Sequence, residues 1–114
     1  MIEDVTRSYL SDTLDVPVYM ELPANAPATC IVLEKTGGSG HTYLHSDTLA
    51  VQSYAPSLFK AASLNDAVIT AMEHMPEHAQ RVYGTGYNTS YNYTDPDTKR
   101  YRYQAVFRIN YYDE

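Results

Sequence analysis

The segment from Arg100 to Tyr111 alternates in polarity with a period of two residues. One set of alternating positions is mainly aromatic and aliphatic: Tyr101, Tyr103, Ala105, Phe107, Ile109 and Tyr111. The other set is mainly polar: Arg100, Arg102, Gln104, Val106, Arg108 and Asn110. Successive side chains of a β-strand point to opposite faces of the sheet, so this pattern predicts a half-buried strand. Its polar face carries arginines and no nucleophile or general base, which indicates a docking surface rather than a catalytic one.

The length and composition predict one folded domain over residues 1–114. A chain of 114 residues that is 44% hydrophobic buries roughly two-thirds of its unfolded surface, which is enough for a core without cross-links. Cys30 is the only cysteine, so no disulfide forms within the chain, and this fits a reducing compartment. We expect no secretory signal, because the acidic start lacks an apolar core, and no membrane span, because no apolar run is long enough.

The rest of the sequence predicts two helices and five strands. Apolar residues at helical spacing indicate a helix over residues 2–14 and a longer one from 58 to 75, which Pro76 ends. Extended segments are expected over residues 16–22, 28–36, 42–54, 79–93 and 99–112. We interpret residues 37–40 and 94–98 as turns, and expect a bulge near residues 45–47. The predicted fold is α+β, with two helices packed on a mostly antiparallel sheet in the order α-β-β-β-α-β-β.

The charges are unevenly distributed along the chain. Residues 1–80 carry three basic and ten acidic residues, a formal charge of −7. Residues 81–114 carry five basic and four acidic residues, a formal charge of +1. This balance argues against a general affinity for nucleic acid, which depends on a basic footprint. It suits a protein whose basic edge meets the acidic body of a neighbouring copy.

The carboxyl-terminal third is also rich in tyrosine, since eight of the twelve tyrosines lie within residues 81–114. Tyrosine and arginine are enriched at protein interfaces. The candidate interface residues are therefore Arg100, Arg102, Arg108, Tyr87, Tyr91, Tyr93, Tyr101 and Tyr103. Two other interpretations stay open: a hairpin that stacks on and pairs with single-stranded nucleic acid, and a solvated sheet face.

The sequence offers no convincing catalytic or metal-binding motif. Lys35 precedes the glycines at 37–40 and a strand follows them, which is the wrong order for a phosphate loop. His74 and His78 have metal-ligand spacing, but Pro76 lies between them and breaks the helix geometry. A hydrolase that uses His41, His45 or His74 is the weakest alternative, because no nucleophile is paired with a base. We expect a protein that is not an enzyme and has no cofactor or metal.

Four stretches of the chain, in this order, carry a resemblance to a known family. They are Val16–Leu22 with Pro23, Leu33–Gly38, Ala50–Leu58 and Lys99–Phe107. Together they resemble the tail-completion proteins of long-tailed phages and prophages of Gram-positive bacteria, which include tail terminators and minor tail components. The resemblance covers nearly the whole chain.

This resemblance implies a structural virion protein without catalytic residues. Its subunits would form a ring, a hexamer, at the head-proximal end of the tail tube, where the ring caps the tube and joins it to the head. The partners implied are other copies of the chain, the major tail tube protein and the neck or head-completion proteins, with no membrane and no specific nucleic acid. The implied location is the virion tail, and the bacterial cytoplasm during assembly.

Overall fold

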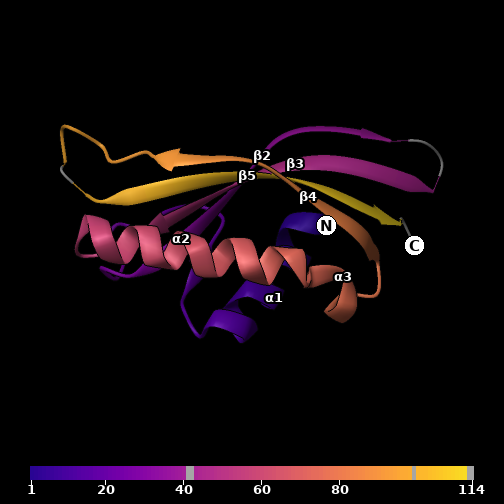
Figure 1. The fold of residues 1–114 in the computed structure, drawn as a ribbon, viewed down its shortest axis with the longest axis horizontal. Coiled ribbons are helices and arrows are strands. Elements are labelled where there is room, and N and C mark those ends of the chain that lie inside the picture. The colour runs from indigo at the N-terminus through magenta and orange to yellow at the C-terminus, as the bar shows by residue number, and fades with distance from the viewer. Residues whose placement is uncertain (41–42, 99, 113–114) are drawn as a thin grey trace.

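The protein consists of a twisted five-stranded β-sheet with its helices on one face (Figure 1). The computed structural model describes residues 1–40, 43–98 and 100–112. The strands are β1 (Val18–Tyr19), β2 (Cys30–Gly40), β3 (Leu44–Tyr54), β4 (Val82–Asn92) and β5 (Arg102–Tyr112). They lie in the order β1-β2-β3-β5-β4, in which only the β1–β2 pair is parallel. The β2–β3 and β4–β5 ends project in opposite directions along the long axis of the molecule (Figure 1).

The helices are α1 (Ile2–Leu14), α2 (Leu58–Glu73) and the short α3 (Met75–His78). α2 begins after Ser57, whose hydroxyl oxygen accepts a hydrogen bond from the backbone N–H of Lys60 and so satisfies a free donor of the first turn. α1 ends at Leu14 and is followed by Asp15, which adopts the left-handed conformation (φ 54°). Within the described residues, no helix is long and apolar enough to cross a membrane.

The main hydrophobic core lies between the sheet and the helices. Alternate residues of the central strands enter this core, among them Leu49 and Val51 of β3 and Phe107 and Ile109 of β5, all of which are fully buried. The helices contribute Ile2, Leu10, Val68, Met72 and Met75. A second, smaller cluster of Cys30, Val32 and Tyr54 lies on the opposite face of the sheet. The buried positions of β5 are those that the alternation predicts.

The α+β prediction is confirmed, including the order of the main elements. Several boundaries differ from expectation. The first strand is only two residues long and pairs in parallel with β2, because the chain turns away after Tyr19. α2 ends at Glu73, before Pro76, and Pro76 lies in the first turn of α3, where its missing N–H leaves no helical hydrogen bond unmade.

The prediction of a turn at residues 37–40 is wrong. Gly37–Gly40 form the end of β2 and pair with residues 45–48 of β3, so these four residues are extended. The bulge expected near residues 45–47 lies instead on β2, between Lys35 and Gly37. The glycines serve close packing here: a Cβ atom at Gly38 would lie 2.3 Å from Asp47 Oδ1, and one at Gly40 would lie 2.6 Å from His45 Nδ1.

Candidate functional site

The predicted interface residues lie on or next to β4 and β5, which form an antiparallel pair. Their side chains are divided between the two faces of the sheet. Tyr87 lies on the helix-covered face, where its ring contacts Phe107 at a centroid distance of 5.9 Å. Arg108 and Tyr91 lie on the opposite face, which the helices leave open (Figure 1). The alternation in residues 100–111 predicted this division for β5, with Arg102 and Arg108 on one face and Tyr103 on the other, but the sequence did not assign the tyrosines of β4 to a face.

Two of the three predicted arginines are held by contacts within the chain. Arg102 Nε donates to the carbonyl oxygen of Tyr93 at 2.5 Å and Arg102 Nη1 donates to the Tyr54 hydroxyl at 2.9 Å. Its guanidinium also lies 4.4 Å from the centre of the Tyr93 ring. Arg100 donates to the carbonyl oxygen of Pro27 at 2.5 Å and lies over the Tyr54 ring at 4.9 Å. Arg100 thus fastens the end of the hairpin to the loop before β2, and Arg102 fastens it to the end of β3. These contacts reduce the capacity of both arginines to bind a partner.

Arg108 has a different environment. Its side chain is exposed, and it makes no hydrogen bond or ion pair with any other described residue. On the open face it lies between Gly86 of β4 and Thr48 of β3, which are small neighbours that leave the guanidinium accessible. Of the three predicted arginines, Arg108 is the best placed to meet a partner.

The predicted tyrosines are largely accessible. Tyr87 is 49% exposed, Tyr91 and Tyr93 are each 41% exposed, and Tyr101 is 40% exposed, whereas Tyr103 is half-buried. Tyr91 and Tyr93 contact each other edge to face at 5.8 Å, so the structure brings them together beside Arg102. An accessible aromatic ring with a hydroxyl group is the side-chain type that interfaces favour.

The open face of the sheet is mostly polar and carries few charges. Its central residues are Ser46, Thr48, Ala50, Gln52, Gly84, Gly86, Thr89, Tyr91, Gln104, Val106, Arg108 and Asn110. The amide of Gln52 donates to Gln104 Oε1 at 2.9 Å, and Gln104 Nε2 donates to the Tyr91 hydroxyl at 2.5 Å. This chain of hydrogen bonds crosses three strands and gives the face a fixed, nearly neutral surface.

β4 is the outer strand of the sheet, and within the part of the chain that the structure describes it pairs only with β5. All eleven of its residues, from Val82 to Asn92, are uncharged, and none is proline. Natural edge strands usually carry lysine, proline or an inward-pointing charge that prevents pairing with another chain. β4 has two bulges, after Val82 and after Tyr87, but otherwise presents an unprotected row of backbone donors and acceptors.

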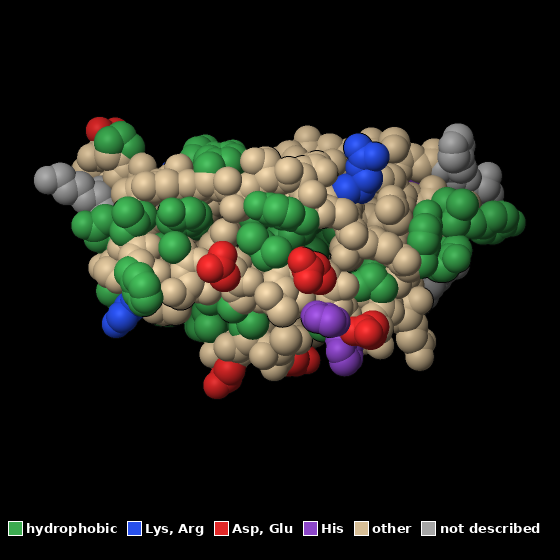
Figure 2. Space-filling model, viewed as in Figure 1, with side chains coloured by type: hydrophobic (Ala, Val, Ile, Leu, Met, Phe, Trp, Pro, Cys, Tyr) green, Lys and Arg blue, Asp and Glu red, His purple; other side chains and the backbone are tan. Residues whose placement is uncertain are grey.

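Exposed hydrophobic residues also gather at the other end of the molecule, for which the sequence indicates no site. They are Tyr43 (71% exposed), Leu44, Tyr83 and Tyr112, and the last two rings pack at 4.7 Å. Figure 2 shows a group of hydrophobic side chains at this end of the molecule, as well as others along the same face. Tyr83 and Tyr112 were visible in the sequence as part of the tyrosine-rich segment, but nothing there indicated that the end of the first hairpin would lie beside them.

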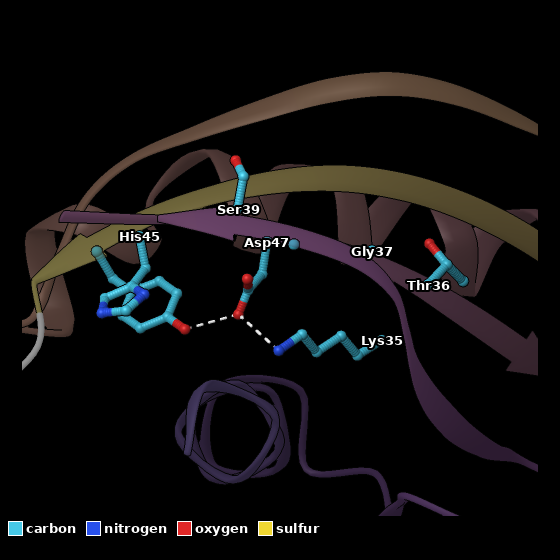
Figure 3. Close-up of a pocket in the computed structure, with 8 residues that line it drawn as sticks. Lys35, Thr36, Gly37, Ser39, His45 and Asp47 are labelled. Carbon is cyan, nitrogen blue, oxygen red and sulfur yellow. Dashed lines mark hydrogen bonds and ion pairs between the residues drawn. The ribbon is translucent and has the colours of Figure 1, made fainter. Parts of the chain in front are cut away.

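A buried carboxylate forms the centre of a polar cluster under the same hairpin (Figure 3). Asp47 is 3% exposed, and its Oδ2 accepts a hydrogen bond of 2.6 Å from the Tyr111 hydroxyl and lies 3.3 Å from Lys35 Nζ. The His45 ring stacks on the Tyr111 ring at 5.2 Å. Burial, followed by the bond to Asp47, raises the pKa of Tyr111 to about 12. These residues line an open pocket of about 660 Å³ together with Thr36, Gly37, Gly38 and Ser39.

The histidines considered as ligands occupy separate places. His74 pairs with Glu77 at 2.8 Å at the junction of α2 and α3, and His78 stacks on Tyr9. His45 lies in the Asp47 cluster, and His41 is outside the described residues. Among the residues that the structure describes, no three histidine, cysteine or acidic side chains lie close enough to hold a metal ion.

Comparison of the sequence with models of protein families and with curated proteins finds no match.

Proposed function

We propose that this chain is a structural subunit of a phage tail, a tail terminator or closely related completion protein that works by assembly. The proposal joins the resemblance of the four sequence stretches to one structural observation, the unprotected edge of β4. A free strand edge eleven residues long and without charge is a liability for a monomer, and it is useful to a subunit whose edge is covered by a partner.

The hydrogen-bonding pattern indicates which groups of β4 face this partner. The N–H of Tyr93 donates to Arg102, and the N–H of Tyr112 donates to Arg81. Because donors alternate in direction along an antiparallel strand, the N–H groups of Thr85, Tyr87, Ser90 and Asn92 point away from β5. These are the donors that a partner strand would use.

A second copy of the chain is the first partner in this proposal. A closed ring needs a heterologous interface, in which one patch of each subunit meets a different patch on the next. β4 and the exposed Arg108 supply one patch, and the acidic remainder of the chain supplies an unlike surface. The hexameric size comes from the resemblance alone.

The ring would cap the tail tube and contact the major tail tube protein and the neck proteins, in the virion tail. Tyr87, Tyr91 and Tyr93 are accessible for these contacts or for the contacts between subunits. The decisive experiment is electron microscopy of tails assembled without this protein. We expect tubes of uncontrolled, excessive length, whereas tails of normal length that join heads would overturn the proposal.

A nucleic-acid-binding module is the second candidate function. The observation that favours it is the stack of Arg102 on Tyr93 with Tyr91 beside it, since exposed aromatic rings with an arginine can stack on bases. The hydrogen bonds of Arg102 to a carbonyl and a hydroxyl oxygen weigh against this function, because they occupy guanidinium N–H groups that would otherwise bind phosphate. Fluorescence anisotropy with labelled oligonucleotides at low salt separates the two functions, and a titration without signal change eliminates this one.

A further inference from the structure

The sheet has a second free edge, on the outer side of β2. β1 pairs with β2 only at Ile31 and Val32, so no other described residue pairs with the stretch from Glu34 to Gly40 on that side. Every residue from 34 to 40 is exposed. This edge lies at the opposite side of the sheet from β4, which makes the two edges unlike surfaces of one subunit.

The free donors of β2 follow from the same alternation. The N–H of Ile31 points away from β3, because it donates to the Pro17 carbonyl oxygen on the β1 side. Alternate residues of β2 share this direction, and the bulge adds one residue between Lys35 and Gly38. The N–H groups of Lys35, Gly38 and Gly40 therefore also point outward. In both β2 and β4, therefore, the residues with outward N–H groups carry their side chains on the helix-covered face.

We propose that β4 of a second copy pairs in antiparallel fashion with this edge of β2. In this pairing Lys35 lies opposite Ser90 of the second copy, Gly38 opposite Tyr87, and Gly40 opposite Thr85. The proposal deepens the assembly function and rests on it, since it names the acceptor of the β4 edge. It produces a heterologous contact, because one edge of each subunit remains free for the next copy.

The spacing of the two bulges supports this register. β2 has one extra residue between Lys35 and Gly37, and β4 has one between Tyr87 and Thr89. At each bulge, the two residues with outward N–H groups are therefore three residues apart instead of two: Lys35 and Gly38 on β2, and Tyr87 and Ser90 on β4. Because the two bulges lie opposite each other, the register is the same before and after them. The shared orientation of their side chains places the helices of both copies on the same side of one continuous sheet, as a ring requires.

The charges of the two edges are compatible. β4 carries no charge, so it adds none to the interface. The free edge of β2 carries two charged residues. The exposed Glu34 lies on the open face, and the ammonium group of Lys35 lies 3.3 Å from the Asp47 carboxylate. A buried lysine without a counter-charge would be costly. Pairing the two strands avoids this cost, because Lys35 keeps Asp47 as its partner.

The pocket next to Gly38 then receives a side chain of the second copy. Tyr87 is 49% exposed in the isolated chain, and in the proposed register it lies beside Gly38, which has no side chain to block it. The pocket there has a volume of about 660 Å³ and is lined by Lys35, Asp47 and Tyr111 (Figure 3). An aromatic ring fits this pocket, because its face can contact the Lys35 ammonium and its hydroxyl can reach a polar group.

Disulfide cross-linking tests the pairing directly. Within one chain, positions 35 and 90 lie on opposite edges of the sheet, three strand spacings or roughly 14 Å apart, too far for a disulfide. The double variant Lys35→Cys/Ser90→Cys should therefore form covalent multimers on oxidation, seen as a ladder on a non-reducing gel. The matched control Lys35→Cys/Thr89→Cys should not, because the Thr89 side chain lies on the open face. Native Cys30 is fully buried and does not interfere.

The outcomes separate this inference from the assembly function. Cross-linking of the double variant alone supports the β4–β2 pairing. Dimers of the single variant Ser90→Cys would show that β4 pairs with itself, which overturns this inference and leaves assembly intact. A native protein that forms oligomers, with no cross-link in any variant, would also overturn the pairing, and a protein that stays monomeric with and without its tail partners would overturn the assembly function itself.

A second pair of variants tests the pocket without altering it. Tyr87→Ala should weaken association by about tenfold or more, because it removes a central aromatic side chain. Tyr87→Phe keeps the ring and should retain most of the association. Equal association of Tyr87→Ala and the native protein, measured by sedimentation, would contradict the placement of Tyr87 in the pocket.

Discussion

The Tyr111 hydroxyl donates a hydrogen bond of 2.6 Å to Asp47, a carboxylate that is 3% exposed near the tip of the β2–β3 hairpin. Hydrogen bonds to buried charged groups contribute more than neutral ones, so we expect Tyr111→Phe to lower the free energy of unfolding by about 2 kcal/mol. Urea denaturation at neutral pH measures this difference. A Tyr111→Phe protein as stable as the native one would show that Asp47 gains nothing from the contact.

The same residue predicts a dependence of stability on alkaline pH. The pKa of Tyr111 is raised from 10.0 to about 12 in the folded chain, so folding favours its neutral form. Its contribution to stability is complete below pH 10 and is lost as the pH rises from 10 towards about 12. Urea denaturation of the native protein and of Tyr111→Phe across this range should give two curves that converge at high pH. Parallel curves would exclude a raised pKa for Tyr111.

Gly37 and Gly38 provide a matched pair for the packing of β2. A Cβ atom at Gly38 would lie 2.3 Å from Asp47 Oδ1, whereas one at Gly37 would meet no atom within 4 Å. We expect Gly38→Ala to cost about 1–3 kcal/mol of stability. Gly37→Ala should be neutral or stabilise by about 0.5 kcal/mol, because it restricts the unfolded chain. Thermal unfolding of both variants checks this, and similar stabilities would contradict the role assigned to Gly38.

Arg102 and Arg108 should differ in their contribution to the stability of the fold. Arg102 bonds to Tyr93 and Tyr54, so Arg102→Ala should lower the free energy of unfolding by about 1–3 kcal/mol. Arg108 is exposed and makes no such bond within the described chain, so Arg108→Ala should change the free energy of unfolding by less than about 0.5 kcal/mol. Chemical denaturation measures the stability of the two variants. Equal losses of stability would contradict the different roles of Arg102 and Arg108.

A charge reversal of both Arg102 and Arg108 would therefore mix a folding defect with an assembly defect. The single variant Arg108→Glu is the cleaner probe, because it alters the open face and leaves the intramolecular contacts in place. We expect it to weaken assembly while the unfolding transition stays unchanged. An unaffected assembly would remove Arg108 from the interface.

The sequence predicted those parts of the fold that depend on local periodicity. The alternation from Ala105 to Tyr111 identified the buried face of β5, and helical spacing located α1 and α2. It failed at Gly37–Gly40, because four small residues in a row are typical of turns, whereas here they pair with residues 45–48 of β3. Pairing between strands determines this extended course, and local periodicity does not predict it.

The candidate interface was also only partly predictable. Composition indicated that tyrosine and arginine would be accessible in the last third, and most of these tyrosines are. The binding of Arg100 to Pro27 and the uncovered edges of β2 and β4 depend on strand order, which periodicity does not determine. Residue types could thus indicate a docking surface, and only the topology could indicate an edge.

The most direct test of the account is the mass of the protein in solution, measured by light scattering over a range of concentrations, alone and with the major tail tube protein. The native chain should form a closed oligomer, and Ser90→Ala, which keeps the outward N–H, should do the same. Ser90→Pro removes that N–H without breaking the β4–β5 ladder and should leave a folded monomer of about 13 kDa. Oligomers of the same mass in Ser90→Pro, or a native protein that is monomeric under both conditions, would contradict assembly through the β4 edge.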